Sequence, residues 1–100
     1  MSAPSALETV PTSLPATPAD MAQVHAYVSE SLAPSTRRAY RSALATFRAW
    51  CEDTGVAALP ARPETVAAFV AAEAQAGRKV ATLEQRVAAI RWAHEADLPP

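Results

Sequence analysis

The sequence is poor in cysteine and glycine, and it has no long apolar run. A single thiol, Cys51, can form no disulfide within the chain and no cysteine-based zinc site, and we expect it to be buried as a small apolar residue. No segment approaches the roughly 18 apolar residues that a membrane span needs. The first twenty residues contain no Lys or Arg and no continuous apolar core, so we expect no signal or transit peptide. These absences predict a cytoplasmic protein that has no membrane partner.

Proline is abundant but unevenly placed, since four of the nine prolines fall in the first twenty residues among Ser, Thr and Ala. Such a stretch offers too little apolar surface to offset the entropy that is lost on ordering. We therefore predict a disordered tail over residues 1–19 and one small folded domain over residues 20–100.

The folded part is predicted to be all-α. Alanine is abundant, and no segment alternates β-branched and polar residues over several positions. The two glycines, Gly55 and Gly77, stand between segments with helical apolar spacing, where helix C-caps and turns belong. The four predicted helices span about residues 20–32, 35–54, 63–76 and 80–96.

Three residues are expected to start helices. Asp20 and Ser35 are favourable N-caps, and Pro63 fits the first position of the third helix. The apolar faces that should form the core follow at three- and four-residue spacing. They are Met21, Val24, Val28 and Leu32, then Tyr40, Leu44, Phe47, Trp50 and Cys51, then Val66, Phe69 and Val70, and finally Leu83, Val87, Ile90 and His94. Trp92 points away from the last of these faces, which predicts a partner surface there.

The net charge of −1 hides two basic segments. Residues 35–51 contain four arginines and no acid, and residues 78–92 contain four cations and one acid, whereas the rest of the chain is acidic. Positive segments on an acidic background are typical of a nucleic-acid contact. The arginines that share one sector of the second helix, at 100° per residue, are Arg37, Arg38, Arg41 and Arg48.

The starts of the second and fourth helices both offer cations, small hydroxyls and free backbone N–H groups. Arg78 and Lys79 stand just before the fourth helix, and Thr82, Gln85 and Arg86 share one flank of it. Guanidinium and ammonium groups displace counterions from phosphates, and a helix N-terminus adds partial positive charge. Arg, Gln and Thr can also read base edges in a major groove. We therefore predict that the partner is double-stranded DNA.

Five segments within residues 35–99 occur in an order and spacing that resemble a known family. They are STRRAY at 35–40, FRAWC at 47–51, LPARPETV at 59–66, ATL at 81–83 followed by Arg86 and Ile90, and His94 before Leu98-Pro99. This pattern is similar to the core-binding domain of tyrosine recombinases of the phage-integrase type, which is also called the SAM-like integrase N-terminal domain. Within that family, the pattern is most similar to the Cre recombinase subgroup.

The resemblance implies a small orthogonal bundle of four helices that forms half of a clamp around duplex DNA in DNA integration and recombination. The second and fourth helices would supply the contacts. Ala39 and Ala81 stand where the family has larger or charged residues, which affects sequence-specific readout more than backbone binding. The charge pattern and the resemblance together give these candidate DNA-binding residues: Ser35, Thr36, Arg37, Arg38, Arg41, Arg78, Lys79, Thr82, Gln85 and Arg86.

Two parts of the family pattern are not found in these 100 residues. Strand exchange needs a nucleophilic Tyr and a cluster of Arg, His and Lys in a separate C-terminal domain, and a fifth helix usually follows the Leu-Pro element. Tyr40 and His94 are expected to be packing residues, so we predict no catalytic residue, metal, cofactor or small-molecule substrate. We expect a fragment, a truncated reading frame or the remnant of a degenerate element, which is not an enzyme alone. A missing fifth helix would expose an apolar groove, which favours self-association or pairing with a catalytic domain.

A second hypothesis is a helical protein–protein interaction module that has no nucleic-acid role. This hypothesis predicts a stable oligomer, formed through the apolar face of the first helix and through Trp92. It also predicts that the protein does not respond to duplex DNA at moderate salt.

Overall fold

The computed structural model describes residues 17–100, which form four helices. They are α2 (Pro18–Glu30), α3 (Pro34–Thr54), α4 (Pro63–Gln75) and α5 (Val80–Glu95). No strand occurs in this described range, and the all-α prediction is confirmed. Most of the predicted tail, residues 1–16, lies outside the described residues. Pro18 and Ala19, which the sequence placed in that tail, belong to the first turn of α2.

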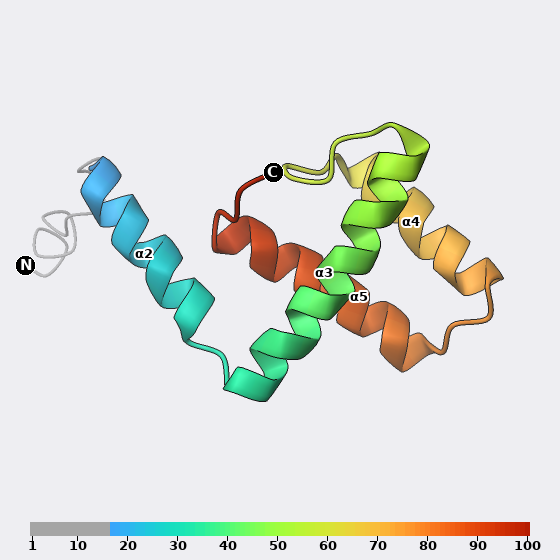
Figure 1. Ribbon diagram of the computed structural model, residues 1–100, viewed down its shortest axis with the longest axis horizontal. Helices are drawn as coiled ribbons and strands as arrows, with labels where there is room; N and C mark the ends of the chain where they lie inside the picture. Colours follow the sequence, from blue (N-terminus) through green and yellow to red (C-terminus); the bar gives the residue numbers. More distant parts are fainter. Residues whose placement is uncertain (1–16) are drawn as a thin grey trace, which may run out of the picture.

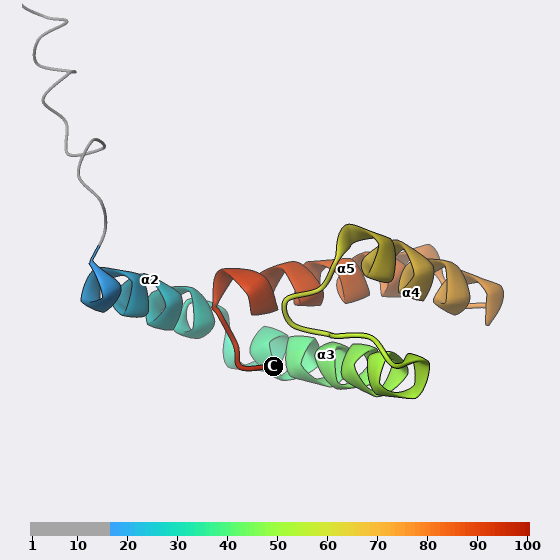
Figure 2. The same ribbon diagram turned by 90° about the horizontal axis from the view of Figure 1, so that it is seen from above.

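Helix α5 is central, because it packs against each of the other three helices. Its contact with α3 is the most extensive, and the two helices cross (Figure 1). Seen from above, α3 forms one layer while α4 and α5 form the other, and α2 lies at one end (Figure 2). The crossing brings the N-terminal ends of α3 and α5 to the same lower edge of Figure 1. The starts of the two basic helices therefore lie on one side of the bundle.

The centre of the core is aromatic. Phe47 and Phe69 are fully buried and meet edge to face, with ring centroids 5.0 Å apart. Trp50 lies 5.6 Å from the Phe69 ring, and Cys51 is buried beside them. Large rings in this arrangement remove much apolar surface from water and add favourable quadrupole contacts. These contacts pack α3 against α4, and the predicted burial of Phe47, Cys51 and Phe69 is confirmed.

The starts of two helices differ from the prediction. Thr17 is the N-cap of α2, and Asp20 lies in the first turn, where it completes a capping box with Thr17. Helix α3 begins at Pro34, with Ala33 as its N-cap, so the expectation that Ser35 caps this helix is wrong. Proline has no N–H to satisfy and its φ is already helical, which favours it at the first position. The predicted start of α4 at Pro63 is confirmed.

Three residues with positive φ end the helices α3, α4 and α5. Gly55 and Gly77, with φ of 84° and 92°, lie at the ends of α3 and α4 as predicted. After α5 the same left-handed position is held by Asp97, with φ of 54°. The N–H of Leu98 donates to the carbonyl of Ala93, and the N–H of Asp97 donates to that of His94. These two hydrogen bonds form a Schellman motif, which usually has Gly at the position that Asp97 occupies here.

The buried face of α5 is wider than the sequence predicted. Ile90 is buried, but Leu83 and Val87 are only half-buried, and His94 is largely exposed as a residue. Trp92 is 4% exposed, so the prediction that it forms a partner surface is wrong. A single apolar stripe describes a helix that is covered on one side, whereas α5 is covered by three neighbours. Its buried residues are Ala89, Ile90, Trp92 and Ala93.

Helix α2 is the least buried element, and it has no buried residue. Of its predicted core face, Val28 packs against the core together with Leu32, which follows the helix. Met21 and Val24 are exposed, and so is Tyr27, which is 74% accessible. The apolar spacing of this segment therefore predicted the helix correctly but overestimated its burial.

Candidate nucleic-acid interface

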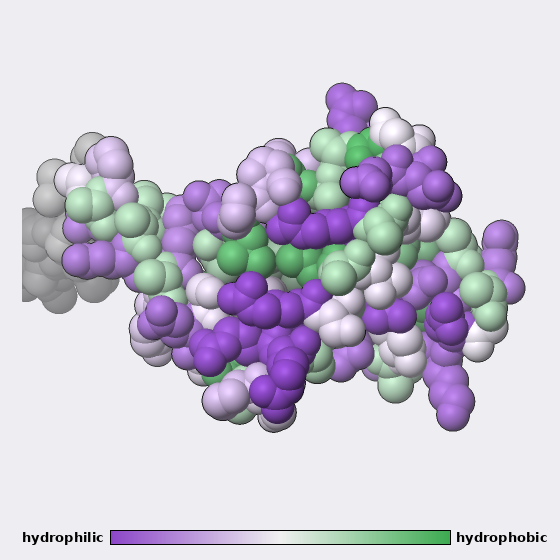
Figure 3. Space-filling view, in the orientation of Figure 1, coloured by the Kyte–Doolittle hydropathy of each residue, from purple (hydrophilic) through white to green (hydrophobic). Residues whose placement is uncertain are grey.

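The start of α3 is polar and carries cations. Ser35, Arg38 and Arg41 are exposed, and Thr36 and Arg37 are half-buried. No side chain within the described residues caps this helix start, so its first-turn N–H groups remain open to an anion. Hydrophilic side chains gather over this half of α3 in Figure 3. The candidate residues predicted here therefore lie together at one helix start.

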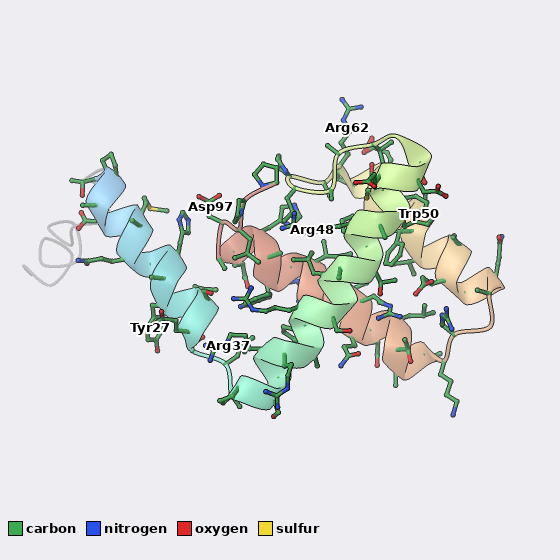
Figure 4. The ribbon with its side chains drawn as sticks, in the orientation of Figure 1. Tyr27, Arg37, Arg48, Trp50, Arg62 and Asp97 are labelled. Atoms are coloured by element: carbon green, nitrogen blue, oxygen red, sulfur yellow. The ribbon has the colours of Figure 1, made fainter. Side chains whose placement is uncertain are left out.

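The arginines of the predicted basic sector of α3 face different neighbours. Arg37 and Arg41 line an open hollow of about 500 Å³ together with Ser29 and Glu30 of α2. The guanidinium of Arg41 also lies 5.6 Å from the centre of the Trp92 ring, which is within the range of a cation–π contact. Figure 4 shows Arg37 beside the end of α2.

Arg48 has a separate role. Its two terminal nitrogens donate to the carbonyls of Pro99 and Pro100, at 2.7 and 2.6 Å. In Figure 4 the side chain lies between α3 and the last residues of the chain. These bonds hold the Leu98–Pro100 segment against α3. The sequence grouped Arg48 with the other arginines because helical angle alone cannot show a contact with a distant segment.

The start of α5 forms the second half of the candidate interface. Arg78, Lys79 and Gln85 are exposed, and Thr82 and Arg86 are half-buried. Lys79 is the N-cap residue, and no described side chain caps this helix. Two helix starts with uncapped N–H groups and cations thus share one edge of the bundle (Figure 1).

Arg86 is tied to an acid that the sequence analysis did not single out. Its Nε donates to Oε1 of Glu73 at 2.9 Å, and only 16% of the Arg86 side chain is exposed. Arg78 approaches the same oxygen, with its Nε 3.7 Å away. Glu73 continues the apolar spacing of Val66 and Phe69 on α4. An acid at a core position was the signal in the sequence that a buried cationic partner was needed.

His94 joins α5 to the loop before α4. Its Nε2 accepts a hydrogen bond from the N–H of Ala61 at 2.9 Å, and its Nδ1 lies 2.7 Å from the carbonyl of Ile90. This arrangement fits a neutral ring that donates from Nδ1 and accepts at Nε2. The prediction that His94 is a packing residue agrees with these bonds, although the residue is more exposed than expected.

An apolar groove of about 420 Å³ runs between α4 and α5, lined by Val70, Leu83 and Val87 among others. Leu83 and Val87, which were predicted to be core residues, are half-buried and line this groove. In residues 17–100, no group of three or more His, Cys, Asp or Glu side chains lies close enough to hold a metal ion. None of the helices described is both long and apolar enough to cross a membrane.

Three helices packed against a central α5, without strands in the described range, define an all-α bundle of the SAM-like kind. The family model for the phage integrase N-terminal SAM-like domain matches residues 24–96, and the chain belongs to this family. The matched range runs from the middle of α2 to the C-cap of α5. Comparisons with curated proteins and with solved structures give no match.

Proposed function

We propose that this chain is the DNA-binding N-terminal domain of a site-specific tyrosine recombinase and that it clamps duplex DNA during integration and recombination. One observation carries the proposal: the starts of α3 and α5 share an edge that bears exposed cations. Membership of the integrase family supports it. The proposed contacts are Ser35, Thr36, Arg37, Arg38, Arg41, Arg78, Lys79, Thr82, Gln85 and Arg86.

These residues suit a phosphate backbone for a physical reason. Each cation that meets a phosphate releases condensed counterions, which gains entropy and makes binding fall steeply with salt. The uncapped N–H groups of both helix starts add partial positive charge at the same edge. The protein's net charge of −1 does not oppose this contact, because the acids lie mostly outside the two basic segments.

Within the family, we propose that the chain lies nearest to the Cre recombinase subgroup. The support is the order of Trp50-Cys51, the Pro-Ala-x-Pro-Glu segment at 60–64 and His94 before Leu98-Pro99. Strand cleavage would be carried out by a separate catalytic domain, acting with this one in the cytoplasm. The DNA-binding unit would begin at the Thr17 cap of α2, three residues before the predicted start at residue 20, and extend to residue 100.

The test is duplex binding measured by fluorescence anisotropy over a series of salt concentrations. The variant combines Arg38→Glu on α3 with Lys79→Glu at the start of α5, both at exposed positions. We expect at least about tenfold weaker binding and a log–log salt slope that is smaller by roughly one to two units. The control is Arg62→Glu, because Arg62 is also exposed but lies at the opposite edge from Arg37 (Figure 4).

The control variant makes the assignment of the surface specific. If Arg62→Glu weakens binding as much as the double variant, the contact depends on overall charge rather than on this edge. If the wild-type domain does not bind duplex DNA at low salt, the proposed function is wrong.

The second candidate function is a helical protein–protein interaction module, and one observation favours it. Met21, Val24 and Tyr27 are large apolar residues that α2 leaves exposed, and such patches often mark protein contacts. This hypothesis predicts an oligomer whose sedimentation does not change when duplex DNA is added. Sedimentation velocity with and without a duplex separates the two functions, and Tyr27→Lys should disperse the oligomer only if the second function holds.

A further inference from the structure

Glu73 is the one charged side chain that is buried within residues 17–100, where it is 9% exposed. Its Oε1 accepts a hydrogen bond from Nε of Arg86 at 2.9 Å and lies 3.7 Å from Nε of Arg78. An apolar residue could fill such a position about as well, because desolvation offsets most of the attraction in a buried ion pair. The presence of a carboxylate here therefore needs a reason beyond packing.

Both arginines meet this carboxylate through Nε, and that leaves their outer ends free. Within the described residues, the terminal nitrogens of Arg78 and Arg86 make no hydrogen bond. No buried side-chain nitrogen or oxygen in that range lacks a partner, so these terminal nitrogens reach solvent. Each guanidinium thus keeps a planar pair of terminal donors near the first two turns of α5. Nε of Arg86 is held by its hydrogen bond to Glu73, whereas Arg78 is drawn to the same oxygen by charge across 3.7 Å.

We propose that Glu73 is a positioning residue, which holds Arg78 and Arg86 so that they read the edges of DNA bases; this inference rests on the proposed function. An arginine side chain has large rotamer entropy, and fixing Nε removes part of that freedom before DNA binds. The two terminal nitrogens of a guanidinium can donate one hydrogen bond each to O6 and N7 of guanine in the major groove.

The charge of the cluster favours a base edge over a phosphate as the atom that these forks meet. Glu73 neutralises one of the two arginines, and its negative charge lowers the attraction for an anionic oxygen nearby. Guanine O6 and N7 are neutral, so for them the orientation of the fork matters more than the net charge. Glu73 should therefore affect sequence discrimination more than overall affinity.

The experiment measures discrimination directly. The wild-type domain first enriches sequences from a pool of duplexes with a randomised centre, and its affinity is then compared for an enriched and a scrambled duplex of equal composition. In Glu73→Gln we expect the ratio of these affinities to fall at least about fivefold. Binding to the scrambled duplex should stay equal or become tighter, because the variant has lost a negative charge.

The matched control is Glu84→Gln, which removes the same charge from an exposed position on α5. This variant should keep the wild-type ratio of the affinities for the enriched and the scrambled duplex. Circular dichroism shows whether Glu73→Gln is less stable than the wild-type domain. Arg78→Lys is a second test variant, because it keeps both the positive charge and the Glu73–Arg86 bond. Because lysine has no planar fork, Arg78→Lys should also lower the ratio.

The outcomes separate the two proposals. If the wild-type domain shows no salt-dependent duplex binding, the proposed function is wrong. If it binds duplexes but enriches no sequence, or if Glu73→Gln and Arg78→Lys both keep the full ratio, Glu73 has no role in reading DNA and the inference is overturned.

Discussion

The indole Nε1 of Trp92 donates a hydrogen bond to the backbone carbonyl of Val28, with 3.3 Å between the two atoms. Trp92 lies on α5 and Val28 on α2, so this bond joins the first described helix to the centre of the bundle. The Trp92 ring also contacts Tyr40, at a centroid distance of 5.9 Å, and lies beneath the guanidinium of Arg41. One buried side chain therefore connects α2, α3 and α5.

Replacing Trp92 should loosen α2 more than the rest of the protein. Trp92→Phe keeps a ring against Tyr40 but loses the bond to Val28, and we expect it to lower the free energy of unfolding by about 1–2 kcal/mol. Trp92→Ala should cost about 3–5 kcal/mol, because it also leaves a cavity. Urea unfolding measures both values. Amide exchange in α2 should rise in both variants, and unchanged exchange there would contradict the role given to this bond.

Glycine should relieve the backbone strain of the left-handed conformation at Asp97. Because an L side chain is disfavoured at the φ of 54°, Asp97→Gly should raise the free energy of unfolding by about 0.5–1 kcal/mol. The variant also removes the approach of Asp97 to His25 at 3.6 Å, but such exposed pairs contribute little. His25→Ala is the control for this loss and should leave the urea midpoint nearly unchanged. A lower midpoint for Asp97→Gly would show that the turn is not strained.

The capping box of α2 should respond to acid. Hydrogen bonding from the Thr17 side chain, and then from its backbone N–H, holds the pKa of Asp20 below its ordinary value of 3.8. The stabilising contribution of this carboxylate is therefore fully present above that value and is lost as the pH falls through the lowered pKa. A carboxyl NMR titration should show a depressed pKa for Asp20 that rises towards its ordinary value in Thr17→Ala, which keeps only the backbone N–H donor. Equal titration curves in the two proteins would refute the capping role.

Cys51 should be unreactive in the folded protein. The side chain is 1% exposed, and burial raises the pKa of its thiol above the ordinary value of 9.0. Since the thiolate is the reactive form, a disulfide reagent at mildly alkaline pH should label the native protein far more slowly than the urea-unfolded protein. Rapid stoichiometric labelling under native conditions would mean that the core opens around Cys51.

The sequence predicted most of the fold because local signals act at short range. Proline at the start of α4 and glycine after α3 and α4 fix helix ends through backbone geometry, and the structure agrees at Pro63, Gly55 and Gly77. The aromatic core of Phe47 and Phe69 followed from helical spacing alone. By contrast, the burial of Trp92 depends on contacts with Val28 of α2 and Tyr40 of α3, which no local pattern encodes.

The candidate interface shows the same division between local and distant contacts. Sequence reasoning located the two basic helix starts, because charge clusters are visible along the chain. It could not show that Arg48 binds the carbonyls of Pro99 and Pro100 or that Arg86 pairs with Glu73. Both partners come from other segments, so both terminal nitrogens of Arg48 are occupied, and Arg86 is available only through its terminal nitrogens.

Because α5 packs extensively against all three other helices, it couples the stability of the helices to one another. Neither α2 nor α4 has a comparably extensive alternative contact, so opening α5 would release both at once. The same helix begins at the cationic edge and ends at the Asp97 turn. Helix α5 therefore belongs both to the cationic surface and to the core. Substitutions that loosen α5 should disturb that surface and the core together.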